Sequence, residues 1–378
     1  MSVRVGIDKT VLQWAIARTG MTAEELSSRS DLGSVDKWLE GDVQPTLKQA
    51  ETLAKLASIP FGYLLLDSPT NDAPVIPDFR TFDSNQVQQF SPELEATILA
   101  CQSRLNWYAD FAMSEDIPPP SLTAQFRVSD DTQDAAQSVL EEVNWGPGKT
   151  EKGRERHLTF SDALEEFGVL VMRSSIVGNN NNKRLDRNEF RAFTLLKNSY
   201  SLVFINGDDY KVGQYFSMAH ELGHVLLGEE GITGERNDHR DVERWCNRFA
   251  ADLLLPTEAL IKRWNEEKQL EDVAAWAYQE YGVSRDTVAW KLADHGLIER
   301  KKALEFLNST HRIMEGGAGG SGGSFHYNVR ARLGTRFLNT VTGALLDGEI
   351  TQEEASEQLG FFKTETVNGL VDFSQGVA

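Results

Sequence analysis

The sequence predicts a mainly α (α+β) protein with an N-terminal helix-turn-helix bundle, a helical domain that holds a small three-stranded sheet, and a C-terminal helical appendage. Two observations predict this class: apolar residues recur at helical spacing along most of the 378-residue chain, and three strand-like segments lie together near its middle. Proline- and glycine-rich breaks then divide the chain. The expected parts are 1–67, a linker at 68–90, the large domain at 91–315, a Gly/Ser linker at 316–324 and the appendage at 325–378.

The N-terminal part, residues 8–67, has the pattern of a run of short helices. Thr22-Ala-Glu-Glu25 is a capping box that begins the second helix, and Gly41 ends the third. The fourth begins near Pro45-Thr46 and carries an apolar stripe at helical spacing. Short capped helices in this order predict a small helical bundle.

The large domain begins with helices and continues with strands. The predicted helices lie at about 92–115, 132–143 and 160–167, and the predicted strands at 168–173, 190–196 and 201–205, with a polar loop at 179–182. The strands are assigned because β-branched and aromatic residues alternate or run together there. Helices resume after Pro256 and include a segment at 284–294.

The tail after the glycine-rich run has a helical pattern of its own. Leu333, Phe337, Val341 and Leu345 are spaced four apart, which predicts that they share one face of a single helix. A second short capped helix is predicted at 351–360. We expect a small helical appendage that serves a partner.

Two histidines four residues apart are the strongest chemical signal in the chain. His220 and His224 lie in 214–227, a segment whose apolar stripe is typical of a helix. On a helix they project from one face, and both imidazoles can bind one zinc ion. Glu221 is rotated by about 100° from His220, so it need not be a ligand and can accept a proton from the water at the open position of zinc. The alternative is a pair of surface histidines.

A third ligand is expected from the next amphipathic helix. If that helix packs antiparallel to the first, Glu243 reaches the metal, and Asn247, one turn later, orients a ligand imidazole. His239, Glu229 and Glu230 are rival ligands, although turn residues beside them favour exposure. Glu243 as a solvated helix residue is the other alternative. Two His, one Glu and a water form a common catalytic zinc set, and the lack of a convincing fourth ligand favours an open site.

Composition narrows the class of protein. The formal net charge of −19 opposes non-specific attraction to nucleic acid and suits a basic partner, although a well-solvated acidic surface explains it equally well. Cys101 and Cys246 lie in apolar helical surroundings, which suggests buried, reduced thiols and a cytoplasmic protein. The N-terminus lacks the apolar region of a signal peptide, and no apolar run is long enough to span a membrane.

Three N-terminal segments resemble the helix-turn-helix domain of the XRE (Cro/C1-type) family. They are Thr22-Ala-Glu-Glu-Leu-Ser27, Val35-Asp-Lys-Trp-Leu-Glu-Gly41 and Pro45-Thr-Leu-Lys-Gln-Ala-Glu-Thr-Leu-Ala54. The resemblance implies that 34–39 lies in the major groove of DNA, with Ser34 and Lys37 as DNA-binding candidates. However, residues 21–50 carry six acids and three bases, which argues against strong DNA binding. The alternative is a fold kept for protein contact or homodimerisation.

Most of the chain is similar to the long members of the ImmA/IrrE family of metallopeptidases, which carry an N-terminal XRE domain. The similarity rests on Ile76-Pro-Asp-Phe-Arg80, Phe216-Ser-Met-Ala-His-Glu-Leu-Gly-His224, Glu243-x-x-Cys-Asn-Arg-Phe-Ala-Ala251 and, after the glycine-rich run, Arg332-Leu-Gly-Thr-Arg-Phe337. The resemblance implies a zincin-like domain in which His220, His224 and Glu243 bind Zn2+ and Glu221 acts as the base.

The function that the resemblance implies is cleavage of a protein partner, such as a transcriptional repressor. In zinc peptidases an edge strand can pair with an extended substrate, and 190–196 is the candidate strand. The alternative is an antitoxin-like binding protein and transcription regulator of a toxin–antitoxin pair, in which zinc is structural or vestigial. If the chain is a peptidase, Glu221→Gln keeps zinc and loses cleavage, whereas His224→Ala loses both.

Overall fold

The computed structural model describes residues 3–19, 21–57, 59, 61–69, 90–148, 155–233, 240–309 and 324–376. Most of the two predicted linkers and the whole Ile76–Arg80 motif lie outside these residues. The chain divides into two compact units, of which the first is made of Met1–Val75, Val87–Ala100 and Asn180–Arg184. The second unit is made of Ile76–Gln86, Cys101–Asn179 and Leu185–Ala378.

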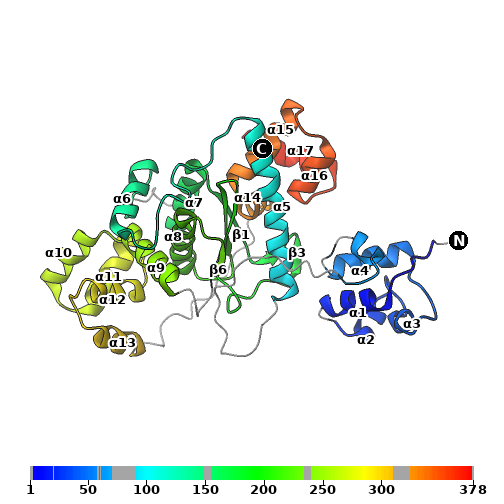
Figure 1. The fold of residues 1–378 in the computed structure, drawn as a ribbon, viewed down its shortest axis with the longest axis horizontal. Coiled ribbons are helices and arrows are strands. Elements are labelled where there is room, and N and C mark those ends of the chain that lie inside the picture. The colour runs from blue at the N-terminus through cyan, green and yellow to red at the C-terminus, as the bar shows by residue number, and fades with distance from the viewer. Residues whose placement is uncertain are drawn as a thin grey trace. The chain divides into compact units, whose positions relative to one another are not determined.

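The first unit contains the predicted run of short helices. They are α1 (Lys9–Arg18), α2 (Ala23–Ser27), α3 (Val35–Glu40), α4 (Leu47–Ala57) and the 3-10 helix η1 (Phe61–Leu65), all visible in Figure 1. Thr22 begins α2 with the predicted capping box, since the Glu25 carboxylate accepts a hydrogen bond from the Thr22 amide at 2.7 Å. Gly41 ends α3 in the left-handed conformation, at φ 85°. One buried core, which includes Leu12, Leu26 and Leu53, joins these helices.

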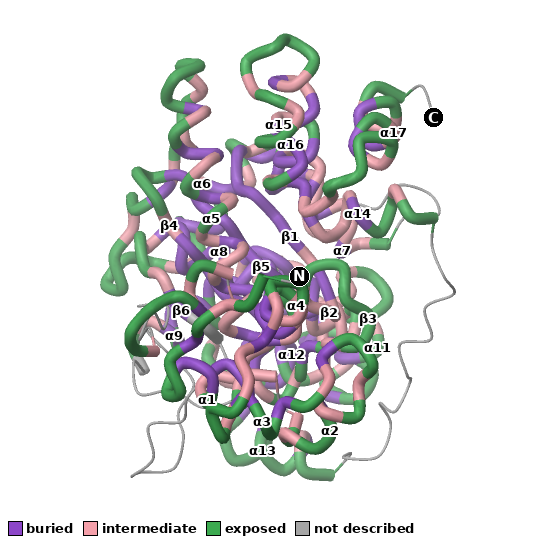
Figure 2. Tube along the Cα trace, turned by 90° about the vertical axis from the view of Figure 1, so that its right-hand side faces the viewer, coloured by how far each residue is buried: buried purple, intermediate pink, exposed green. Residues whose placement is uncertain are grey.

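The second unit is built on a four-stranded sheet in the order β1-β5-β4-β6. Its strands are β1 (Leu170–Ser174), β5 (Tyr200–Asn206), β4 (Ala192–Lys197) and β6 (Gly231–Thr233). β1 runs parallel to β5 with Leu170 opposite Leu202, and β4 runs antiparallel to β5 with Phe193 opposite Phe204. The three predicted strands are confirmed, and β6 is a fourth. Figure 2 shows β1 and β5 largely buried, as expected for strands made of nearly continuous apolar runs.

Two predictions about strands are wrong. The segment 190–196 is not an edge, because β4 has β5 on one side and pairs on the other with β6, where Phe193 lies opposite Ile232. The polar segment 179–182 is not a loop throughout, because it enters β3 (Asn180–Arg184), which follows β2 (Ile176–Val177). Both errors arise because the strands concerned show no apolar alternation in the sequence: β6 has only three residues, and β3 is polar.

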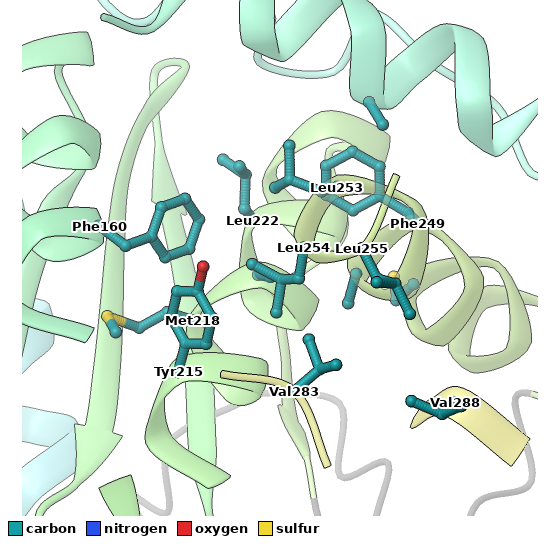
Figure 3. Packing of buried hydrophobic residues seen from close by; sticks show 14 of the residues in the cluster. Phe160, Tyr215, Met218, Leu222, Phe249, Leu253, Leu254, Leu255, Val283 and Val288 are labelled. Atoms are coloured by element: carbon teal, nitrogen blue, oxygen red, sulfur yellow. The ribbon is translucent and has the colours of Figure 1, made fainter. Parts of the chain in front are cut away.

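Helices of the second unit pack against the sheet or against one another. They are α5 (Pro92–Ser114), which begins in the first unit, and then α6 (Thr132–Glu142), α7 (Arg156–Phe167), α8 (Lys211–Leu227), α9 (Arg240–Leu254), α10 (Thr257–Glu267), α11 (Leu270–Tyr281), α12 (Arg285–Asp294) and α13 (Arg300–Asn308). The apolar faces of α6 to α13 contribute to one core, in which Phe160 of α7, Leu222 of α8 and Phe249 of α9 are buried (Figure 3). Among the described residues no helix is both long and apolar enough to cross a membrane.

The C-terminal segment forms α14 (Phe325–Leu333), α15 (Thr335–Asp347), α16 (Gln352–Leu359) and α17 (Thr364–Ser374). The prediction that Leu333 and Phe337 share one helix is wrong, because Gly334, at φ 78°, separates α14 from α15. A Cβ atom at Gly334 would lie 2.6 Å from Glu165 Oε1 and 2.7 Å from the Val171 carbonyl oxygen, so the corner requires glycine. These helices belong to the same compact unit as the sheet.

Candidate metal site

The two histidines of the motif lie on α8, in the interior of the second unit. α8 packs against α7, α9 and the strands β4 and β5, and it ends at Gly228 in the left-handed conformation. His220 is 2% exposed and His224 is fully buried, so they are not surface histidines. Their Nε2 atoms lie 3.2 Å apart, as expected for side chains one helical turn apart on one face.

Glu243 of α9 faces both imidazoles. Its Oε2 lies 3.2 Å from His220 Nε2, and its Oε1 lies 3.2 Å from His224 Nε2. Burial disfavours the charged forms of these groups, but the hydrogen bonds between them outweigh burial. The result is that the pKa of Glu243 is lowered and the pKa of His220 is raised. Glu243 is therefore not a solvated helix residue; it is 4% exposed.

Asn247 lies one turn after Glu243 and contacts the other ring nitrogen of His220. His220 Nδ1 is 3.1 Å from Asn247 Oδ1. When the Nδ1 proton is donated to the amide oxygen, the contact holds the ring so that Nε2, which hydrogen-bonds to Glu243 in the metal-free site, is the atom that would bind a metal ion. α9 thus contributes both the carboxylate and a side chain that sets the ring orientation.

The arrangement of these donor atoms fits a zinc ion. Ligand atoms about 2.0–2.2 Å from zinc in tetrahedral geometry lie about 3.3–3.6 Å from one another. The two Nε2 atoms lie 3.2 Å apart, and each lies 3.2 Å from a different oxygen of Glu243, so these separations are close to this spacing. Two imidazoles and one carboxylate are also the donor set of many catalytic zinc sites.

Cys246 is a further donor beside the two histidines, and its spacing in the sequence does not indicate this role. One ligand atom from each of His220, His224 and Cys246 lies within 4.8 Å of the others, and all three residues are buried. The thiol is free and buried, as predicted, and burial raises its pKa. Glu243 also lies close to both imidazoles, with one of its oxygens 3.2 Å from each Nε2 atom.

Gly223 explains how α9 comes close enough to α8. A Cβ atom at this position would lie 3.1 Å from Cys246 Sγ and 3.2 Å from Cys246 Cα. Any larger residue would therefore push α9, with Glu243, away from the histidines. The local pattern around Gly223 does not predict this role, because a close approach between helices is a tertiary property.

Glu221 is fully buried, and a residue of β4 holds its side chain. Thr194 Oγ1 donates a hydrogen bond to Glu221 Oε2 at 2.7 Å, and Thr194 is itself fully buried. The sequence placed Thr194 in a strand but gave no signal for this contact. β4 therefore contributes to the site through a side chain as well as through the sheet.

The other candidate residues lie elsewhere. Glu230 Oε1 accepts a hydrogen bond from the Leu196 amide at 2.6 Å, Glu229 is exposed, and His239 lies outside the described residues. The DNA-binding candidates are in the first unit, where Ser34 is the N-cap residue of α3 and Lys37 lies on α3, both exposed. The structure brings together His220, His224, Glu243 and Asn247 around one point.

Comparison with known proteins adds one finding about the second unit. Neither the curated proteins nor the solved structures contain a match to this chain. Among models of protein families, one matches a segment of the chain. This segment runs from α7 to α12 and contains the whole sheet together with α8 and α9. Residues 164–293 match the family model of the IrrE N-terminal-like domain, Peptidase_M78.

Proposed function

We propose that this protein is a zinc-dependent endopeptidase that cleaves, and thereby controls, a protein partner such as a transcriptional repressor. The observation that carries the proposal is a buried site in which the Nε2 atoms of His220 and His224 lie 3.2 Å apart and each lies 3.2 Å from one oxygen of Glu243. The match of this region to the M78 peptidase family supports it. The proposed zinc ligands are these three side chains.

The proposed chemistry divides between the metal and the chain. Zinc, when bound, would polarise the scissile carbonyl and lower the pKa of the attacking water. Glu221 accepts the proton of that water and passes it to the leaving amine. Thr194 fixes the Glu221 carboxylate, and Asn247 fixes the His220 ring.

The first test is the zinc content of the purified full chain. We expect about one zinc per wild-type chain, strong loss of zinc in Glu243→Ala, and retention in Cys246→Ala. Glu229→Ala is the matched control, because Glu229 is an exposed acid near the end of the same helix α8. Zinc retained in Glu243→Ala but lost in Cys246→Ala would replace Glu243 by Cys246 as the third ligand. A wild-type chain that takes up no zinc would refute the site.

A second candidate function is the antitoxin-like binding protein with a non-catalytic metal. The observation that favours it is the complete burial of Glu221 and His224, since a polypeptide substrate has to reach both. Glu221→Gln separates the two functions, because it removes the base and leaves every proposed ligand. If this variant keeps the biological effect in cells, the protein acts by binding.

Binding of DNA and homodimerisation are separate proposals for the first unit. Ser34 and Lys37 on α3 are the residues that would contact DNA. If DNA is bound, Lys37→Ala weakens retardation of an operator fragment in a gel, and binding falls steeply with added salt. Light scattering of the full chain measures whether it forms a dimer.

A further inference from the structure

A cavity of about 240 Å3 lies in the second unit, away from the two histidines. Its walls come from α7 and from α14 with the start of α15, and β1, β5 and α8 complete it. Pockets for drug-sized ligands are usually about 300–1,000 Å3. A ligand for this cavity is therefore a small molecule or ion.

Arg173 is the side chain of the cavity that most clearly indicates a ligand. It follows Val171 by two residues on β1, so both side chains stand on the same face of the strand and line the cavity. Its guanidinium donates one hydrogen bond, to Gln214 Oε1 at 3.2 Å, and makes no ion pair with any described residue. Burial lowers the pKa of Arg173, and the charge of Glu155 only partly opposes this. A guanidinium has five N–H donors, so most of its hydrogen-bonding capacity is available.

Two further side chains of the cavity, on α7, can donate hydrogen bonds to a negative group. His157 lines the cavity at the first turn of α7, a helix whose N-cap residue Glu155 makes no side-chain capping hydrogen bond. Burial and the charge of Arg173 lower the pKa of His157 to about 4, so the ring is neutral at pH 7 and donates one hydrogen bond, to the cavity in the tautomer with the proton on Nε2. The Ser161 hydroxyl, one turn further on, adds another donor.

The acids near the cavity limit the charge of the ligand. Glu155 pairs with Lys211 and lies 3.4 Å from His157 Nδ1. Both oxygens of Glu165 accept backbone amide hydrogen bonds, from Thr335 at 3.1 Å and Arg336 at 3.0 Å. Asp162 also lines the wall, and its carboxylate disfavours an anion of high charge, such as a nucleoside triphosphate.

We propose that this cavity binds a small anion with a single carboxylate or phosphate group, held by Arg173, His157 and Ser161. A bidentate contact with the guanidinium is the geometry that such groups favour. The bound anion would neutralise a half-buried cation whose charge Glu155 offsets only in part. Binding needs neither zinc nor peptidase activity.

A ligand in the cavity would contact α8, the helix that carries His220 and His224. Met218 lines the cavity and precedes His220 on α8 by two residues, and Gln214, the partner of Arg173, lies on the same helix. In Figure 3, Met218 lies beside Phe160 and Tyr215 in the core. An anion that orders this end of α8 is therefore expected to change zinc affinity, because coupling between two sites is reciprocal.

The test uses the full chain with inorganic phosphate and acetate as probes. Melting temperature and calorimetric titration are recorded with each probe, and with chloride at equal ionic strength. We expect a saturable stabilisation by one or both probes that chloride does not reproduce. Phosphate alone would identify a phosphate-type ligand, and acetate alone a carboxylate. A wild-type chain that shows no saturable effect with either probe would overturn the proposal.

Three variants assign the binding to this cavity. Arg173→Met removes the donors and is expected to weaken binding at least tenfold. Ala331→Leu fills the cavity from α14 without changing any charge, and it decides the matter if Arg173→Met does not fold. Arg300→Met is the matched control, because Arg300 is an exposed arginine on α13 that does not line the cavity. Unchanged binding in Ala331→Leu or in folded Arg173→Met would overturn the proposal.

Discussion

The substitution Lys291→Met tests how the end of α9 is held. Lys291 of α12 is 4% exposed, and its Nζ donates to Asp252 Oδ1 at 2.7 Å, to the Leu255 carbonyl at 2.6 Å and to the Ala251 carbonyl at 3.1 Å. The Ala251 carbonyl lies in the last turn of α9 and also accepts a hydrogen bond from the Leu255 amide at 3.1 Å, whereas Leu255 directly follows the helix. Lys291 therefore acts as a cap for the helix that carries Glu243.

The expected cost follows from these contacts. Removing one partner of a buried ion pair costs about 3–5 kcal/mol, because the other charge stays buried. The hydroxyl of Thr132 still donates to Asp252 Oδ2 at 2.6 Å, which places the expected loss near the lower end of this range. Methionine keeps the length and most of the volume of lysine, so loss of packing contributes little.

Urea unfolding of the metal-free chain, followed by circular dichroism and tryptophan fluorescence, measures the loss. Lys301→Met is the control, because Lys301 is an exposed lysine on α13 in an i,i+4 pair with Glu305. The double variant Lys291→Met with Asp252→Asn removes both charges and is expected to be more stable than Lys291→Met alone. A single variant within about 1 kcal/mol of wild type, or a double variant no better than the single, refutes this account of the ion pair.

Three further changes test other parts of the second unit. Gly334→Ala forces a Cβ atom against Glu165 Oε1 and the Val171 carbonyl, so we expect faster proteolysis of the C-terminal helices than in wild type. Burial, only partly opposed by backbone hydrogen bonds, raises the pKa of Glu165 to about 7 from an ordinary value of 4.5. The folded state therefore binds this proton more tightly, and the stability of wild type relative to Glu165→Gln falls as the pH rises from 4.5 through about 7; equal pH profiles would contradict this. Thr194→Val leaves the buried Glu221 carboxylate without its 2.7 Å donor, so it is expected to cost about 1–3 kcal/mol and to retain zinc, and an unchanged unfolding midpoint would contradict it.

Local patterns predicted much of the fold. The capping boxes at Thr22 and Thr351 begin helices in the structure, because a cap depends on residues three apart in the chain. The spacing of Leu333 and Phe337 led to a wrong prediction, because it also depends only on residues close together in the chain. A period of four continues across Gly334, and only the contact of that glycine with Glu165 and β1 shows that the helix has to stop there.

The site was predictable where one helix carries the pattern. His220 and His224 are neighbours by helix geometry alone, and Glu243 and Asn247 required only that a second amphipathic helix pack nearby. The contributions of Thr194 and Gly223 were not predictable, because a buried hydroxyl and a close helix approach depend on distant partners. The same is true of β6, which has three residues and no apolar alternation.

The corner between α14 and α15 also affects whether a further strand can pair with the edge of the sheet at β1. β1 is an outermost strand, and an uncovered outer strand recruits strands from other molecules. Here α14 lies against β1, and the Gly334 corner meets the backbone at Val171 so closely that a methyl group does not fit. The C-terminal helices thus protect the molecule from self-association through this strand, and a chain shortened at Asn308 is expected to aggregate even though its metal-binding residues are intact.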